Sequence, residues 1–129
     1  MMTDIQQPQT HYERLDRVRK YIREHTDEPL NRHVLAAVAG FSVPHFHRIF
    51  TAYVGENIAG YVRRVRLERA GRKLRMGAVD ITEVALAAGY DTHAAFSRAF
   101  KQQFGLSPSE FRQLDCNTAT YLLMKGKRP

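Results

Sequence analysis

The chain has 129 residues, enough for one domain or two small subdomains, and its 43% hydrophobic content excludes a wholly disordered protein. Its 20 Lys and Arg residues against 13 Asp and Glu residues give a net charge of +7, which predicts a polyanionic partner, either nucleic acid or an anionic membrane surface. No apolar run reaches the length of a membrane-spanning helix, no signal peptide opens the chain, and the single cysteine, Cys116, excludes an internal disulfide and any cysteine-cluster zinc site. We therefore expect an intracellular, cytoplasmic protein.

The first part of the chain predicts a helix-turn-helix subdomain over residues 11–55. Residues 1–10 are polar and aperiodic, and we expect a flexible tail there. Apolar spacings of three and four then predict three helices, over residues 11–25, 31–39 and 42–53. Gly40 can end the second helix, and Ser42 can cap the third, whose first turn tolerates Pro44.

Residues 56–76 form the longest helical stretch, which we expect to connect two subdomains. Its first half places Ile58, Tyr61 and Val62 on one stripe. Its second half places Leu67 and Leu74 on nearly the opposite side. A helix on a single core would keep one apolar face, so this helix is predicted to pack on one subdomain first and on the other afterwards.

Residues 77–114 predict a second helix-turn-helix subdomain. Asp80 can cap a short helix, Asp91 or Thr92 can cap the next one, and Gly105 can end it. A last helix is expected from Ser107 and Pro108 to about residue 114. Residues 118–124 are strand-like, so residues 115–129 are predicted to be a tail, or a linker to a C-terminal domain that the chain lacks.

The helix-turn-helix pattern occurs twice. Ala39-Gly40-Phe41 recurs 49 positions later as Ala88-Gly89-Tyr90. After the turn the offset becomes 50, and the recurring residues are Phe46, Arg48, Phe50 and Gly55, repeated as Phe96, Arg98, Phe100 and Gly105. The extra residue falls in the turn, where an insertion costs least. Such a duplication predicts two similar subdomains, each presenting one helix.

The presented helices have small, polar and basic outward faces. These faces carry Pro44, His47, Arg48 and Thr51 in the first helix, with His45 at the edge, and Ala94, Ser97, Arg98, Lys101 and Gln102 in the second. Such a face suits a helix that lies in a DNA major groove, although solvated surface helices carry similar faces. Arg48 and Arg98 occupy equivalent positions, where they can read guanine, clamp phosphate, or remain simply solvated.

Two stretches carry a resemblance to a known family. They are the connector Tyr61-Val62-Arg63-Arg64-Val65-Arg66-Leu67-Glu68-Arg69-Ala70 and a spaced pattern of Gly89-Tyr90, Phe96-Ser97-Arg98-Ala99-Phe100-Lys101, Phe104-Gly105, Ser107-Pro108 and Phe111-Arg112. Over residues 11–114 the chain closely resembles the DNA-binding domain of the AraC/XylS family of transcription regulators. The resemblance implies an all-α fold of about seven helices, with two helix-turn-helix subdomains joined by a long central helix.

The resemblance also implies that the two recognition helices enter successive major grooves on one face of the DNA. The DNA-binding residues carried over to this chain are Pro44, His45, His47 and Arg48 in the first helix and His93, Ala94, Ser97 and Arg98 in the second. Several family members have a bulky or amide side chain where this chain has Pro44 and Ala94, so its operator cannot be copied from relatives. The sequence also leaves the effector and the sign of regulation open.

We therefore predict a sequence-specific regulator that binds double-stranded DNA, associates with the nucleoid and covers an asymmetric site as a monomer. The alternative is a basic helical interaction module that docks on a protein such as RNA polymerase without reading DNA. No membrane partner is expected, because the apolar stripe of the connector changes sides. No cofactor or metal is expected either, since His45 and His47 point about 200° apart on their helix. An enzyme is not expected, because Ser97 and His93 lack an orienting acid.

Overall fold

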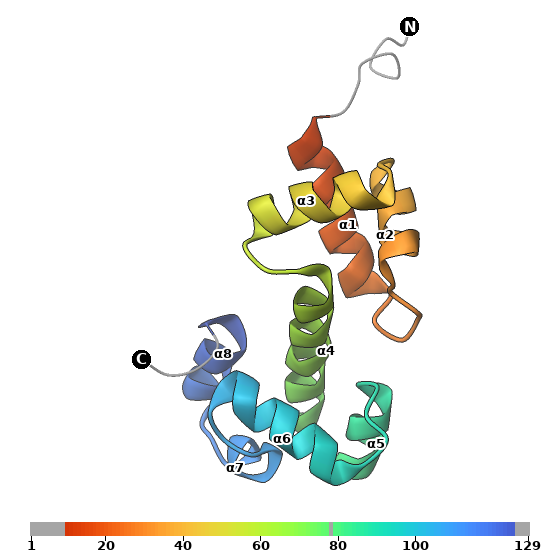
Figure 1. Cartoon of the computed structure of the whole chain (residues 1–129). Coiled ribbons are helices and arrows are strands. Elements are labelled where there is room, and N and C mark those ends of the chain that lie inside the picture. Colours follow the sequence, from red (N-terminus) through yellow and green to blue (C-terminus); the bar gives the residue numbers. More distant parts are fainter. Residues whose placement is uncertain (1–9, 78, 126–129) are drawn as a thin grey trace, which may run out of the picture. The chain divides into compact units, whose positions relative to one another are not determined.

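The computed structural model describes residues 10–77 and 79–125. Over these residues every regular element is a helix, which confirms the predicted all-α fold (Figure 1). The eight helices of this described part are α1 (His11–Glu24), α2 (Arg32–Ala39), α3 (Val43–Val54), α4 (Ile58–Leu74), α5 (Ile81–Ala87), α6 (His93–Phe104), α7 (Pro108–Arg112) and α8 (Cys116–Lys125). The expected N-terminal tail, apart from Thr10, and the basic residues 126–129 lie outside the described residues.

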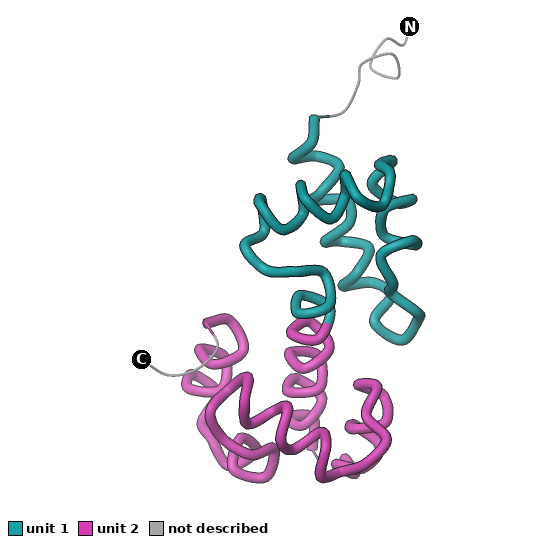
Figure 2. The backbone as a smooth tube through the Cα atoms, in the orientation of Figure 1, with its two compact units in different colours: residues 1–62 teal, residues 63–129 magenta. Residues whose placement is uncertain are grey.

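The helices form two compact units (Figure 2). Unit 1 contains α1, α2, α3 and the beginning of α4, up to Val62. Unit 2 begins at Arg63 and contains the rest of α4 with α5, α6, α7 and α8. The boundary therefore lies inside one continuous helix.

Unit 1 is built around aromatic rings from α3 and α4. The rings of Phe46 and Phe50 have centroids 5.5 Å apart, and Phe50 meets Tyr61 edge-on at 5.5 Å. All three side chains are fully buried. The Tyr61 hydroxyl accepts a hydrogen bond from Arg19 Nε of α1 at 3.4 Å, and this bond raises the pKa of Arg19. These contacts attach the first turn of α4 to unit 1.

Unit 2 has a larger aromatic core, centred on Phe100. Its ring centroid lies 5.6 Å from that of Phe96, 4.7 Å from that of Phe104 and 5.3 Å from that of Phe111. The part of α4 in this unit contributes three buried side chains to the same core, those of Leu67, Ala70 and Leu74. The predicted change of buried face along the connector is thus confirmed, because Tyr61 packs in one core and these three residues in the other.

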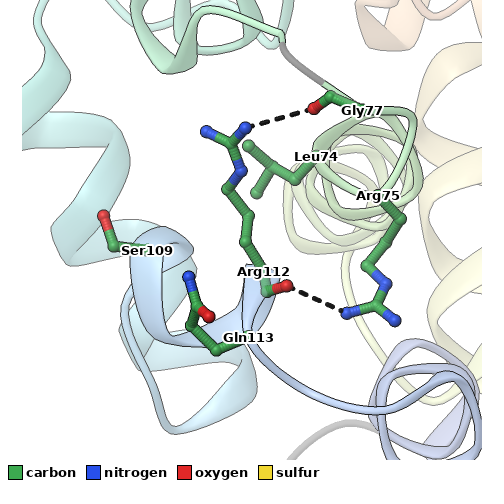
Figure 3. A pocket seen from close by; sticks show the side chains of 6 residues that line it. All are labelled: Leu74, Arg75, Gly77, Ser109, Arg112 and Gln113. Carbon is green, nitrogen blue, oxygen red and sulfur yellow. Dashed lines mark hydrogen bonds between the residues drawn. The ribbon is translucent and has the colours of Figure 1, made fainter.

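The end of α4 and the end of α7 are connected by two arginines (Figure 3). The Arg75 guanidinium donates to the carbonyl oxygens of Phe111 at 3.2 Å, Arg112 at 3.3 Å and Leu114. Carbonyls at the end of a helix lack intrahelical donors, so Arg75 satisfies them. Arg112 in turn donates to the Gly77 carbonyl at 3.1 Å, across a polar hollow of about 490 Å³.

The strand-like tail predicted at residues 118–124 was wrong, because these residues belong to helix α8. Asp115 accepts hydrogen bonds from the backbone N–H of Thr118 at 2.7 Å and from its hydroxyl at 3.0 Å, and these bonds lower the pKa of the Asp115 carboxyl. Ala119 and Leu122, three residues apart, are buried in the unit 2 core. Threonine and tyrosine favour strands, but the packing of one helical face decides the structure here.

Candidate nucleic-acid interface

The same turn precedes α3 and α6. Gly40 has φ +76° and Gly89 has φ +94°, in the left-handed region where a side chain would be strained. The residue after each glycine closes the turn: Phe41 N–H donates to the Ala36 carbonyl, and Tyr90 N–H donates to the Ala85 carbonyl, both at 3.0 Å. The two donor residues are 49 positions apart in the sequence, and so are the two acceptor residues, which confirms the duplicated turn.

An arginine from the preceding long helix lies beside each turn. In unit 1, Arg14 of α1 donates to the Gly40 carbonyl at 3.4 Å, and its guanidinium lies 5.0 Å from the centroid of the Phe41 ring. In unit 2, Arg66 of α4 has Nη1 4.0 Å from where a Cβ on Gly89 would lie. Burial raises the pKa of the neighbouring Tyr90 phenol, an effect that the nearby arginine charges oppose. Both turns therefore carry positive charge.

The extra residue in the second turn changes how the presented helix begins. Ser42 precedes α3, but its side chain makes no capping hydrogen bond. Thr92 precedes α6, and its hydroxyl oxygen accepts from the Ala95 N–H at 3.0 Å. Of the two predicted caps, Asp91 and Thr92, the structure thus identifies Thr92.

On α3 the structure separates the predicted DNA-binding residues into two groups. Pro44, His47 and Arg48 are exposed, and together with Arg32 and Val43 they line a hollow of about 360 Å³. The sequence did not place Arg32 beside these residues, since it belongs to α2. In the sequence, only the position of Arg32 as the first residue of the helix before the turn could have indicated this placement.

His45 and Thr51 form the second group, and both are half-buried. The His45 ring lies 5.7 Å from that of His11 and 5.0 Å from that of Phe41, so it packs against α1 and the turn. The Thr51 hydroxyl oxygen is buried without a hydrogen-bond partner. Over the described residues this hydroxyl therefore does not point outward as expected.

On α6 four of the five predicted residues, His93, Ala94, Arg98 and Lys101, are exposed, and Ser97 is half-buried. The opposite side of the helix buries Phe96, Phe100 and Phe104 in the core. A rigid hydrophobic face thus orients the polar face toward solvent.

The two equivalent arginines, Arg48 and Arg98, are unpaired within the part of the chain that the structure describes. Within residues 10–77 and 79–125, neither Arg48 nor Arg98 makes an ion pair or a hydrogen bond with another side chain. Each is exposed, so its five donors can reach a planar acceptor such as a guanine edge or a phosphate. The described residues contain no cluster of three potential metal ligands and no helix long and apolar enough to cross a membrane.

Comparison with protein families identifies the same region. A family model described as a helix-turn-helix domain matches residues 35–114. The regulatory protein SoxS of Salmonella typhimurium is 32% identical over 103 residues, which cover 80% of this chain and 96% of SoxS. The right origin-binding protein of Escherichia coli is 37% identical over 93 residues, which cover 72% of this chain and 32% of that protein. This chain therefore spans about a third of the length of that relative.

Solved structures agree with this assignment. An AraC-type transcriptional regulator from Chromobacterium violaceum matches with a TM-score of 0.74 and 27% identity, covering 78% of this chain and 90% of that one. The DNA-binding domain of the global transcriptional factor AdpA, solved in complex with a target DNA, matches with a TM-score of 0.68 and 28% identity, covering 86% and 95%. With the duplicated turn, the exposed basic helices and these relatives, the chain belongs to the AraC family of DNA-binding transcription regulators.

Proposed function

We propose that this chain regulates transcription by inserting α3 and α6 into successive major grooves of double-stranded DNA. The observation that carries the proposal is a pair of exposed arginines, Arg48 and Arg98, at equivalent positions on two helices that follow the same turn. Neither has an ion-pair partner among the described residues. A helix whose outward side chains reach base edges can distinguish all four base pairs in the major groove. The relative AdpA, solved with its target DNA, supports DNA as the partner.

The proposed contacts divide into two kinds. Arg48 and Arg98, with the exposed His47 and His93, reach bases, and Ala94 offers a methyl group to a thymine methyl. Lys101 is exposed farther along α6 and contacts phosphate. Because the two reading faces differ, one molecule covers an asymmetric site as a monomer. Such a partner implies that the protein acts on the nucleoid, in the cytoplasm.

Binding to random and to selected duplexes at several salt concentrations tests this proposal. Affinity for both should fall steeply with salt, with a log–log slope of about −0.9 per phosphate neutralised. Arg98→Ala should weaken binding to the selected duplex by about 1–3 kcal/mol and binding to random duplexes less. Lys101→Ala should weaken both by the same factor. A flat salt response, or no preference for any sequence, would instead support the alternative module that docks on a protein such as RNA polymerase.

The monomer proposal has its own measurement. Titration of a selected duplex, followed by analytical ultracentrifugation, should give one protein for each asymmetric site. An obligate two-to-one complex on a palindrome would contradict it.

A further inference from the structure

Arg32 is the first residue of α2, and it differs in charge and burial from the residue at the equivalent position of the second repeat. Asn31 caps α2 and Asp80 caps α5, so Arg32 is equivalent to Ile81, 49 positions later. Ile81 is partly buried against the unit 2 core, whereas Arg32 is exposed. The fold of the repeat therefore does not require an arginine here, since the equivalent position in unit 2 is an apolar packing position.

The Arg32 side chain lies beside the reading face of α3. It lines the hollow of about 360 Å³ together with Pro44, His47 and Arg48. It also lines the adjoining hollow of about 380 Å³, where His47 is again a neighbour. Over the described ranges the Arg32 guanidinium makes no ion pair or hydrogen bond. An unneutralised guanidinium thus adjoins His47 and Arg48, two exposed residues that the proposed function assigns to DNA.

We propose that Arg32 contacts a DNA phosphate that flanks the base pairs read from α3. This inference rests on the proposed function and adds a residue that the reading helices do not supply. The first helix of a helix-turn-helix crosses the sugar-phosphate backbone while the second lies in the groove, so a cation at the start of α2 meets phosphate rather than a base edge. Unit 2 has Ile81 at this position, so unit 1 contacts the DNA backbone through an arginine that unit 2 lacks.

The test compares Arg32→Gln, Arg32→Lys and Lys20→Gln in the full chain. Lys20 is exposed on α1, lines neither hollow, and controls for the loss of one positive charge from unit 1. Arg32→Gln should raise the Kd for selected and random duplexes by the same factor, about tenfold. It should also reduce the salt slope by about 0.9. Arg32→Lys should restore most of the affinity, because a point charge is enough for phosphate.

Three outcomes would overturn the inference: an equal effect of Lys20→Gln, a loss at the selected duplex alone, or no effect of Arg32→Gln. An equal effect of Lys20→Gln would show that Arg32 contributes only to the net charge of the protein. A loss at the selected duplex alone would show that Arg32 reads a base, and no effect of Arg32→Gln would show that it lies outside the interface. Circular dichroism and the thermal midpoint of each variant establish that it is folded. Failure of the proposed function is distinguishable, because the unsubstituted protein would then show no sequence preference before any variant is compared.

Discussion

The two units form the same turn but start their reading helices differently. Phe41 and Tyr90 close the two turns with hydrogen bonds of equal length, and buried phenylalanines follow at equivalent positions. The start of the helix differs, since Thr92 caps α6 with its side chain and Ser42 does not cap α3. The turn and the rings therefore set the shape of the unit, while the cap and the outward face can change without altering that shape.

The units also differ in how they fill the space beneath the rings. The buried stripe of Leu15, Val18 and Ile22 in α1 matches that of Leu67, Ala70 and Leu74 in α4 at an offset of 52, and beside the second stripe α4 has the buried Gly71. A Cβ on Gly71 would lie 2.6 Å from Cδ2 of Leu123, which belongs to α8. In unit 2 a glycine thus leaves room that a side chain from a later helix occupies, and α8 is held against the unit in this way.

The largest expected effect comes from removing the central ring of each core. Phe50→Ala and Phe100→Ala should each lower the free energy of unfolding by about 3–5 kcal/mol, because both side chains are fully buried. Phe100→Ala should be the more costly, since Phe100 meets three rings and Phe50 meets two. Urea denaturation measures both values. A clearly smaller loss for Phe100→Ala would mean that the extra rings of unit 2 add no stability.

The second prediction concerns Gly71 and Leu123. Leu123→Ala should destabilise the protein by about 1–2 kcal/mol, because it removes part of the contact between α8 and α4. Gly71→Ala should be more favourable by about 1 kcal/mol in the Leu123→Ala protein than in the unsubstituted one, since the new methyl group then has room. A double-mutant cycle measured by denaturation gives this coupling. Strict additivity would show that Leu123 does not occupy the space left by Gly71.

Much of this architecture could be predicted from the sequence, because it depends on local and periodic signals. Left-handed glycines, helix caps and apolar spacing identified both helix-turn-helix units, and the change of apolar face along α4 predicted its packing on two cores. The same period placed Arg48 and Arg98 on exposed faces, as the structure confirms. Their contact with DNA stays a prediction.

What the sequence did not reveal depends on contacts between distant segments. The helical state of α8 follows from packing beside Gly71, and its threonines and tyrosine concealed the spacing of Ala119 and Leu122. His45 lies at the edge of the outward face of α3 and packs against His11, which is 34 positions away in the sequence. Arg32 likewise joins the reading face of α3 only through the fold of the turn.

A third prediction separates the two helix caps. Thr92→Ala should lower the free energy of unfolding by about 1 kcal/mol, because the Ala95 N–H loses its acceptor. Ser42→Ala should change it far less, since the Ser42 side chain makes no capping bond. Thermal and urea denaturation of the two variants give the comparison directly. Equal losses would show that Ser42 caps α3 in solution after all.

The smallest expected effect is at Thr51, whose equivalent after the turn is Lys101, 50 positions later. The Thr51 hydroxyl is buried without a partner, and such a group costs free energy that a methyl group of similar size avoids. Thr51→Val should therefore raise the free energy of unfolding by about 0.5 kcal/mol. The gain is modest, because a threonine hydroxyl in a helix can rotate toward the carbonyl four residues earlier, which lowers the cost of burying it. The affinity of the Thr51→Val protein for selected and random duplexes should not change. Substitution of the exposed Lys101 by alanine should instead lower the affinity of the protein for both. If Thr51→Val weakens DNA binding while the protein stays folded, the hydroxyl turns outward on DNA and contacts it, as the sequence alone suggested.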